Sequence, residues 1–213
     1  MSAMEAYLEW LDGFVNLLTV AAIVSTFTTS LRVAYDRDSS DVAFWPIALT
    51  MTCSYAWFMY GYALYDHTLI WLNVFSMASA GANTAVHHLF SRDPARRWYR
   101  LAATSAVLCV MCAASPKMTV ESLGHMASGS AVVCGLAALV RVQQVTPVPE
   151  MAFWTMTCSW QWLQKAVTEA NVPLIICHAG GIALTVTELM LSFWLLVHPE
   201  FPAEWTLKTQ KYV

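Results

Sequence analysis

Seven nearly uncharged stretches, most of them close to the length of a membrane-crossing helix, constrain this sequence most strongly. They cover residues 13–31, 42–65, 68–90, 101–116, 126–140, 151–165 and 172–194. A helix needs roughly 20 apolar residues to cross about 30 Å of hydrocarbon. The pattern therefore predicts an all-α membrane protein with seven transmembrane helices, of which the sixth is the shortest.

The low charge of the whole chain argues against a soluble domain. Charged residues make up 12% of the chain, against about 25% in soluble domains. The first apolar stretch does not read as a cleavable signal peptide, because Glu5, Glu9 and Asp12 precede it in place of a positive segment. We expect a multi-pass protein in the plasma membrane or a Golgi or other endomembrane, with lipid around it and no nucleic-acid partner.

The distribution of Lys and Arg predicts the orientation of the chain. With the N-terminus outside or lumenal, nine of the eleven basic residues fall on the inner side, and only Lys117 and Lys165 fall on the outer side. Inner loops of membrane proteins carry such an excess of basic residues. The C-terminus is therefore expected in the cytoplasm.

An internal repeat is visible in an unusual octapeptide. TMTCSYAW (50–57) returns as TMTCSWQW (155–162), with six of eight positions identical at an offset of 105 residues. The same offset pairs Trp57 with Trp162 and Asn73 with His178. Just upstream, DVAFW (41–45) matches EMAFW (150–154) at an offset of 109. The change of offset places a four-residue deletion, about one helical turn, near the start of the sixth helix, which is expected to be shorter by that turn.

A repeat of three helices contains an odd number of crossings, so a further helix must restore the orientation of the second copy. The stretch at 101–116 fills that role. The predicted organisation is a first triple-helix repeat (1–93), a linker helix (94–118), a second triple-helix repeat (119–198) and a short cytoplasmic tail (199–213). The two triple-helix bundles would then be parallel, in a 3+1+3 arrangement.

These features resemble the SWEET (MtN3/saliva) family of sugar transporters, which are built from parallel repeats. The segments that carry the resemblance are SSDVAFWP (39–46), SYAWFMYGYALYD (54–66) and IWLN (70–73). The second half is more divergent, with WLQKA (162–166) and ICHAGG (176–181) at the matching places. The resemblance implies a facilitative transporter of mono- or disaccharides, working by alternating access without a cofactor or metal. A homo-oligomer is left open.

The resemblance also implies a substrate site between the two halves. Asn73, Trp162 and Ser54 match substrate-binding or pocket positions of the family, and His178 stands where the family usually has a second asparagine. Trp57 and Ser159, the repeat partners of Trp162 and Ser54, are expected to pack rather than to contact substrate.

The family's hinge prolines are missing. Ala43, Ala152, Thr26 and roughly Gly135 occupy their positions. Pro46 and Asp66 are the candidate hinge or gating residues that remain.

Two other classes of function compete with a transporter. The first is a non-transporting member of the family that acts as a membrane binding or trafficking partner, and the second is an enzyme or redox protein. A transporter of another small polar solute also remains an alternative to a sugar transporter. A membrane protease or haem protein would use His178, but neither explains the repeat, so no enzymatic activity is expected.

Overall fold

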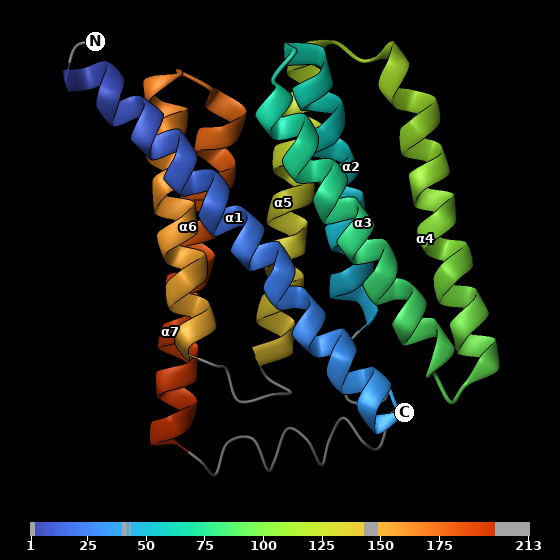
Figure 1. Ribbon diagram of the computed structural model, residues 1–213. Coiled ribbons are helices and arrows are strands. Elements are labelled where there is room, and N and C mark those ends of the chain that lie inside the picture. Colours follow the sequence, from blue (N-terminus) through green and yellow to red (C-terminus); the bar gives the residue numbers. More distant parts are fainter. Residues whose placement is uncertain (1–2, 40–41, 43, 143–148, 199–213) are drawn as a thin grey trace.

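The computed structural model describes residues 3–39, 42, 44–142 and 149–198; Ala43 and the expected tail at 199–213 lie outside them. The described part is helical throughout its length (Figure 1). Its elements are α1 (Ala3–Asp36), α2 (Phe44–Leu64), α3 (His67–Leu89), α4 (Pro94–Ala114), the short 3-10 helix η1 (Ser115–Lys117), α5 (Val120–Val142), α6 (Pro149–Thr168) and α7 (Val172–Val197).

The α-helices have the dimensions of membrane spans. Four segments combine the length and the apolar composition required to cross a bilayer, namely 9–36, 67–89, 97–117 and 172–191. The other three helices, α2, α5 and α6, have 21, 23 and 20 residues. At about 1.5 Å per residue each of these is also long enough to cross the hydrocarbon layer.

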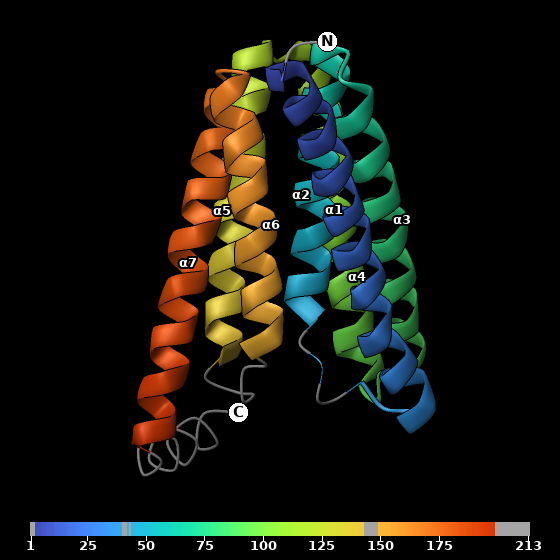
Figure 2. The same cartoon turned by 60° about the vertical axis from the view of Figure 1, so that its left-hand side comes forward.

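Two groups of three helices face one another. In the first group α3 packs against both α1 and α2, and in the second α7 packs against both α5 and α6. The groups meet where α2 contacts α5 and where α1 contacts α6. The repeat relates α1 to α5 and α2 to α6, so these two contacts are equivalent under the pseudo-symmetry. Helix α4 lies at the edge of the first group against α2 (Figure 1). Figure 2 shows the groups closest at the end where α1 begins and diverging toward the end where α1 finishes.

The repeat is reproduced in backbone detail where the second helix of each group turns into the third. Tyr65 and Ala170, 105 residues apart, both take the left-handed conformation, with φ of 57° and 51°. The next residues, Asp66 and Asn171, are both N-caps whose side chains accept from the backbone N–H three residues later, at 3.0 and 3.2 Å. Such caps satisfy N–H groups that have no partner within the helix. The offset of 105 therefore holds in space as well as in sequence.

The expected shortening of the sixth helix is wrong. Helix α6 has 20 residues against 21 in α2, and the two helices begin at Pro149 and Phe44, which are 105 residues apart. Pro149 and Glu150 extend α6 beyond the uncharged stretch, because proline fits the first helical position and an acidic residue favours the first turn. The starts of the two helices therefore follow the offset of 105, and not the offset of 109 that the match of residues 41–45 with 150–154 gives.

Gly61 lets α2 approach α3 closely, and this contact gives a test of the packing. A Cβ on Gly61 would lie 2.7 Å from the Cβ of Leu69 and 3.2 Å from the backbone nitrogen of Ile70. Gly61→Ala should lower the thermal stability of the purified protein, because overpacking typically costs about 1–3 kcal/mol.

Gly13→Ala is the matched control, since nothing lies within 4 Å of its Cβ position. In a helix interior that change should be neutral or stabilising by up to about 1 kcal/mol. Equal thermal unfolding temperatures for the two variants would contradict the close approach of α2 and α3.

Candidate functional site

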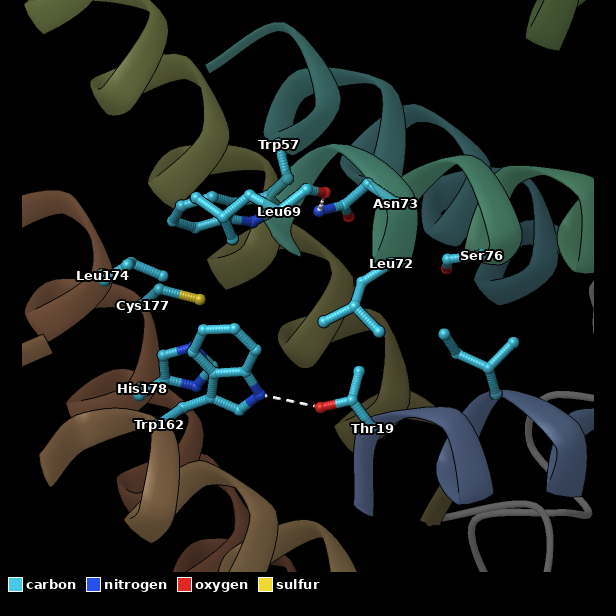
Figure 3. Close-up of a pocket in the computed structure, with 11 residues that line it drawn as sticks. Thr19, Trp57, Leu69, Leu72, Asn73, Ser76, Trp162, Leu174, Cys177 and His178 are labelled. Atoms are coloured by element: carbon cyan, nitrogen blue, oxygen red, sulfur yellow. Dashed lines mark hydrogen bonds between the residues drawn. The ribbon is translucent and has the colours of Figure 1, made fainter. Parts of the chain in front are cut away.

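A pocket with a volume of about 160 Å³ lies where the two groups of helices meet. Most of its lining consists of residues that the repeat pairs with one another. These pairs are Trp57 with Trp162, Leu69 with Leu174, Leu72 with Cys177, and Asn73 with His178; Thr19, Ile23 and Ser76 complete the lining. The pocket therefore lies on the pseudo-symmetry axis of the molecule (Figure 3).

On the second-repeat side of the pocket an indole and an imidazole are stacked. The rings of Trp162 and His178 are nearly parallel, with centroids 5.6 Å apart and an interplanar angle of 8°. The indole N–H of Trp162 donates to the hydroxyl of Thr19 in α1 at 2.8 Å (Figure 3). That hydroxyl in turn donates to the carbonyl of Val15. Trp162 is thus fixed both by a hydrogen bond from the opposite group and by its neighbour on α7.

The first-repeat side offers an amide and a second indole. The side-chain amide of Asn73 donates to the carbonyl of Leu69 at 2.8 Å, which holds the carboxamide at the pocket wall. One amide hydrogen is committed there, and an asparagine can form up to three further hydrogen bonds. Trp57 is buried, lies edge-on to Tyr60 and also lines the pocket. Each half therefore contributes an indole and a polar group to the pocket, a carboxamide from the first half and an imidazole from the second.

Ser54 lies one layer behind the pocket rather than in its wall. Its hydroxyl donates to the carbonyl of Thr50 at 2.8 Å and pairs with the hydroxyl of Ser76 at 2.7 Å. Ser76 itself lines the pocket. Ser54 therefore positions a lining hydroxyl. At the matching place in the second half, Gly181 stands opposite Ser159 and leaves no hydroxyl to position.

The two candidate gating residues lie away from the pocket at opposite ends of helices. Pro46 is the third residue of α2, inside the first turn, where proline does not break the hydrogen-bond ladder. Asp66 is the N-cap of α3. The structure gives Asp66 a structural role at the helix end, and Pro46 lies too near its helix terminus to kink a span.

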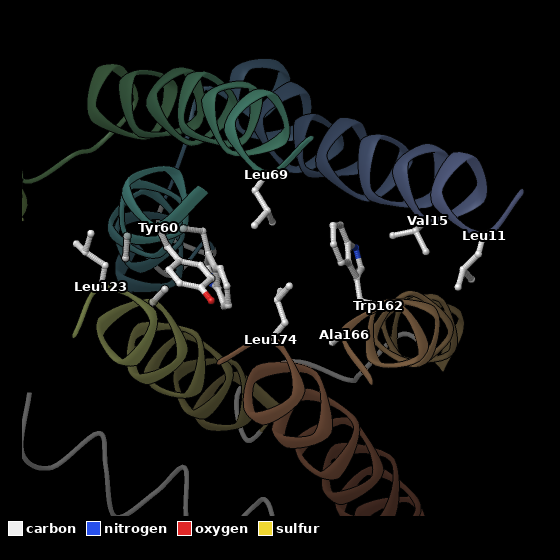
Figure 4. Close-up of a cluster of buried hydrophobic side chains, with 11 residues drawn as sticks. Leu11, Val15, Tyr60, Leu69, Leu123, Trp162, Ala166 and Leu174 are labelled. Carbon is white, nitrogen blue, oxygen red and sulfur yellow. The ribbon is translucent and has the colours of Figure 1, made fainter. Parts of the chain in front are cut away.

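An apolar cluster closes the pocket on the side where α1 begins. Its members come from both groups of helices and include the lining residues Trp57, Leu69, Trp162 and Leu174. Figure 4 shows side chains of α2, α3, α6 and α7 converging there, with Leu11 and Val15 of α1 beside Trp162. Val15 and Ala166 are fully buried. The cluster separates the pocket from that end of the molecule.

Two polar contacts join the groups just beyond this cluster. The phenol of Tyr60 donates to the side-chain oxygen of Asn171 at 3.0 Å. The ammonium of Lys165, the repeat partner of Tyr60, pairs with Asp12 of α1 at 2.9 Å and with Glu169 at 3.5 Å. Lys165 is only 6% exposed. Burial raises the pKa of the Glu169 carboxyl, and the neighbouring Lys165 opposes that rise.

At the other end two ion pairs each join residues of the first group. Arg32 pairs with Asp36 on α1, and Arg92 pairs with Asp38. Nearer the pocket the groups are joined by the hydrogen bond from Trp162 to Thr19 and by weak sulfur contacts, for example between Thr50 and Cys134 at 3.8 Å. The structure is therefore closed at the end where α1 begins.

Three of the four residues expected to bind substrate, Asn73, Trp162 and His178, line this pocket, and Ser54 does not. Trp57, which was expected only to pack, also lines it; its register with Trp162 already placed the two indoles at equivalent sites. No sequence signal pointed to Thr19, because α1 lies outside the clear part of the repeat.

Comparisons with known proteins support the resemblance read from the sequence. Residues 9–95 match the MtN3/saliva family model, described as a sugar efflux transporter for intercellular exchange. No curated protein matches the chain. The solved structure of a eukaryotic SWEET transporter superposes with a TM-score of 0.76 over 91% of this chain and 98% of that chain, at 14% sequence identity. The all-α fold with seven helices expected from the sequence is thus confirmed.

Proposed function

We propose that this protein, whose first repeat matches the sugar efflux family and whose fold is that of a SWEET transporter, carries sugars across a membrane by alternating access. The observation that supports this most directly is the pocket on the repeat axis, lined by four residue pairs, one member from each half. Substrate sites of repeat-built transporters lie at such interfaces, because rocking of the halves then exposes one site to either side.

The side chains in the pocket suit a sugar ring. A sugar has apolar C–H faces, which stack on aromatic rings, and hydroxyls at its rim, which need hydrogen-bond partners. Trp57 and Trp162 supply the aromatic surfaces, while Asn73 and His178 supply groups that donate and accept. A mainly apolar pocket with a few convergent polar groups is typical of small-molecule sites.

The size of the pocket favours a single sugar ring. Its volume of about 160 Å³ is well below the roughly 300–1,000 Å³ of pockets for drug-sized ligands. A disaccharide has about twice the bulk of a monosaccharide. We therefore assign monosaccharides, rather than disaccharides, as the main substrates.

The orientation follows from the basic residues, with the N-terminus outside or lumenal. In that orientation the apolar cluster and the two polar contacts, Tyr60 with Asn171 and Lys165 with Asp12, form an outer closure. The structure then represents a conformation that is closed to the outside. Outward opening requires both polar contacts to break.

The proposed orientation can be tested with epitope tags. A tag inserted between Arg92 and Arg100 should be protected in intact cells, and a tag at the N-terminus should be accessible. A C-terminal tag serves as the control and should behave like the Arg92–Arg100 tag. An N-terminus protected together with the C-terminus would refute the arrangement.

Substrate uptake tests the site. In transport-deficient cells the wild-type protein should take up labelled monosaccharides and discriminate against disaccharides. Asn73→Ala should raise the half-saturating concentration about two- to tenfold, because a net hydrogen bond contributes roughly 0.5–1.5 kcal/mol. Trp57→Ala and Trp162→Ala should each reduce uptake more than Asn73→Ala does. Trp162→Phe should keep part of the uptake activity, and His178→Asn should keep transport.

The matched control for both indoles is Trp71→Ala, since Trp71 is 70% exposed on α3. All variants are compared at equal surface expression. Unchanged uptake in the Asn73→Ala, Trp162→Ala double variant would eliminate the site. A wild-type protein that reaches the membrane but transports no sugar or other polar solute would support the non-transporting alternative.

The outer closure can be probed with the native thiol of Cys177, which lines the pocket. In a background without the other five cysteines, Lys165→Met should increase the reaction of Cys177 with a membrane-impermeant reagent added outside. An ion pair with exposed partners contributes up to about 1 kcal/mol, so the expected increase is roughly fivefold.

Lys117→Met, at the exposed outer lysine, is the control and should leave the rate unchanged. Tyr60→Phe should act in the same direction as Lys165→Met. If neither variant changes the rate, the closure does not depend on these contacts.

A further inference from the structure

The corner between the end of α3 and the start of α4 concentrates positive charge. Arg92, Arg96, Arg97 and Arg100 fall within nine residues of sequence, with Asp93 as the one acidic residue among them. Arg92 is engaged by Asp38 at 2.6 Å. The membrane-crossing segment of α4 begins at Arg97. The arginines therefore lie at the level where hydrocarbon gives way to lipid headgroups.

Arg97 and His88 both contact the exposed indole of Trp98. The Arg97 guanidinium lies 5.9 Å from the ring centroid of Trp98, and the His88 ring meets the same indole edge-on at 5.0 Å. Trp98 itself is 62% exposed. The Nε of Arg97 and the Nδ1 of His88 are buried without a hydrogen-bond partner within the described part of the chain. Unpaired buried polar groups are uncommon and call for a partner.

Arg100 continues the same corner one turn further along α4. Its guanidinium lies 5.4 Å from the ring of Phe44, at the start of α2, and His87 contacts that ring at 5.3 Å. His87 also bonds to the carbonyl of Val42 at 3.0 Å. Residues of α2, α3 and α4 thus build the corner together.

This placement of arginines opposes the intrinsic preference of a helix. The first turn of a helix carries partial positive charge, so cations there are unfavourable and anions are favourable. Orientation in the membrane requires basic residues on this side, but it does not require them to pack around Trp98 and Phe44 with a guanidinium nitrogen unpaired. A bound anion at the surface of the corner would balance this charge.

We propose that this corner binds the headgroup of an anionic phospholipid of the inner leaflet. Arg97 and Arg100 contact the headgroup charge, His88 adds a hydrogen-bonding group, and Trp98 lies at the interface as interfacial tryptophans do. Anionic lipids are concentrated on the cytoplasmic side, where the basic corner is placed by the proposed orientation. This binding is independent of the transported substrate.

Native mass spectrometry of the full-length protein tests the proposal. Purified protein is exposed to an equimolar mixture of phosphatidylserine and phosphatidylcholine with identical acyl chains. The wild-type protein should retain phosphatidylserine preferentially, and the preference should fall as salt is raised. Arg97→Gln and Arg100→Gln should each weaken it roughly fivefold, since a basic residue near the surface contributes about 1 kcal/mol.

Arg32→Gln is the matched control, because Arg32 is exposed and pairs with Asp36 on its own helix; it should retain the preference. Arg97→Lys should retain most of it. Equal retention of both lipids by the wild-type protein, or an unchanged preference in both Arg→Gln variants, would overturn the proposal. Excess inorganic phosphate should not displace the lipid; displacement would instead identify a site for free phosphate.

Discussion

The backbone of a chain in a bilayer must satisfy its own hydrogen bonds, and this constraint governs the rest of the structure. Hydrocarbon offers no donor or acceptor, so the spans are helices and the polar side chains among them need partners inside the protein. Asn73, Ser54 and Thr19 all donate to a carbonyl of their own helix. Ser54 and Thr19 also form hydrogen bonds between helices, with Ser76 and Trp162. The pocket brings polar groups from both halves together, among them Asn73 and His178.

The two repeats share one backbone arrangement and differ in the side chains at equivalent positions. The offset of 105 relates Tyr60 to Lys165, and both reach across to the other half, one with a phenol and the other with an ammonium group. The same offset relates Asn73 to His178 in the pocket wall. The two halves therefore keep these residues at equivalent positions but differ in their chemistry and contacts, which gives the pocket two unlike sides.

Helix α1 carries several side-chain hydrogen bonds to its own backbone around Thr26, one of the positions where the resemblance leads us to expect a proline. Ser25, Thr26 and Thr28 all donate to carbonyls three residues back on the same helix. Such back-bonds compete with the helical ladder and often bend a helix. Thr26 also pairs with Ser79 of α3 at 3.0 Å. Side-chain bonds to backbone carbonyls thus cluster around Thr26 within the continuous helix α1.

Hydropathy and the repeated octapeptide were sufficient to predict the all-α fold and the approximate span limits, because both signals are local or periodic along the chain. The resemblance to the SWEET family then implied three of the residues that line the pocket, namely Asn73, Trp162 and His178. The sequence alone did not place the start of α6, since Pro149 and Glu150 look like loop residues until their positions in a first helical turn are seen. It also could not assign Thr19 to the pocket or pair Lys165 with Asp12. Those contacts join helices that are far apart in the chain, and only the packing of the two halves decides which side chains meet.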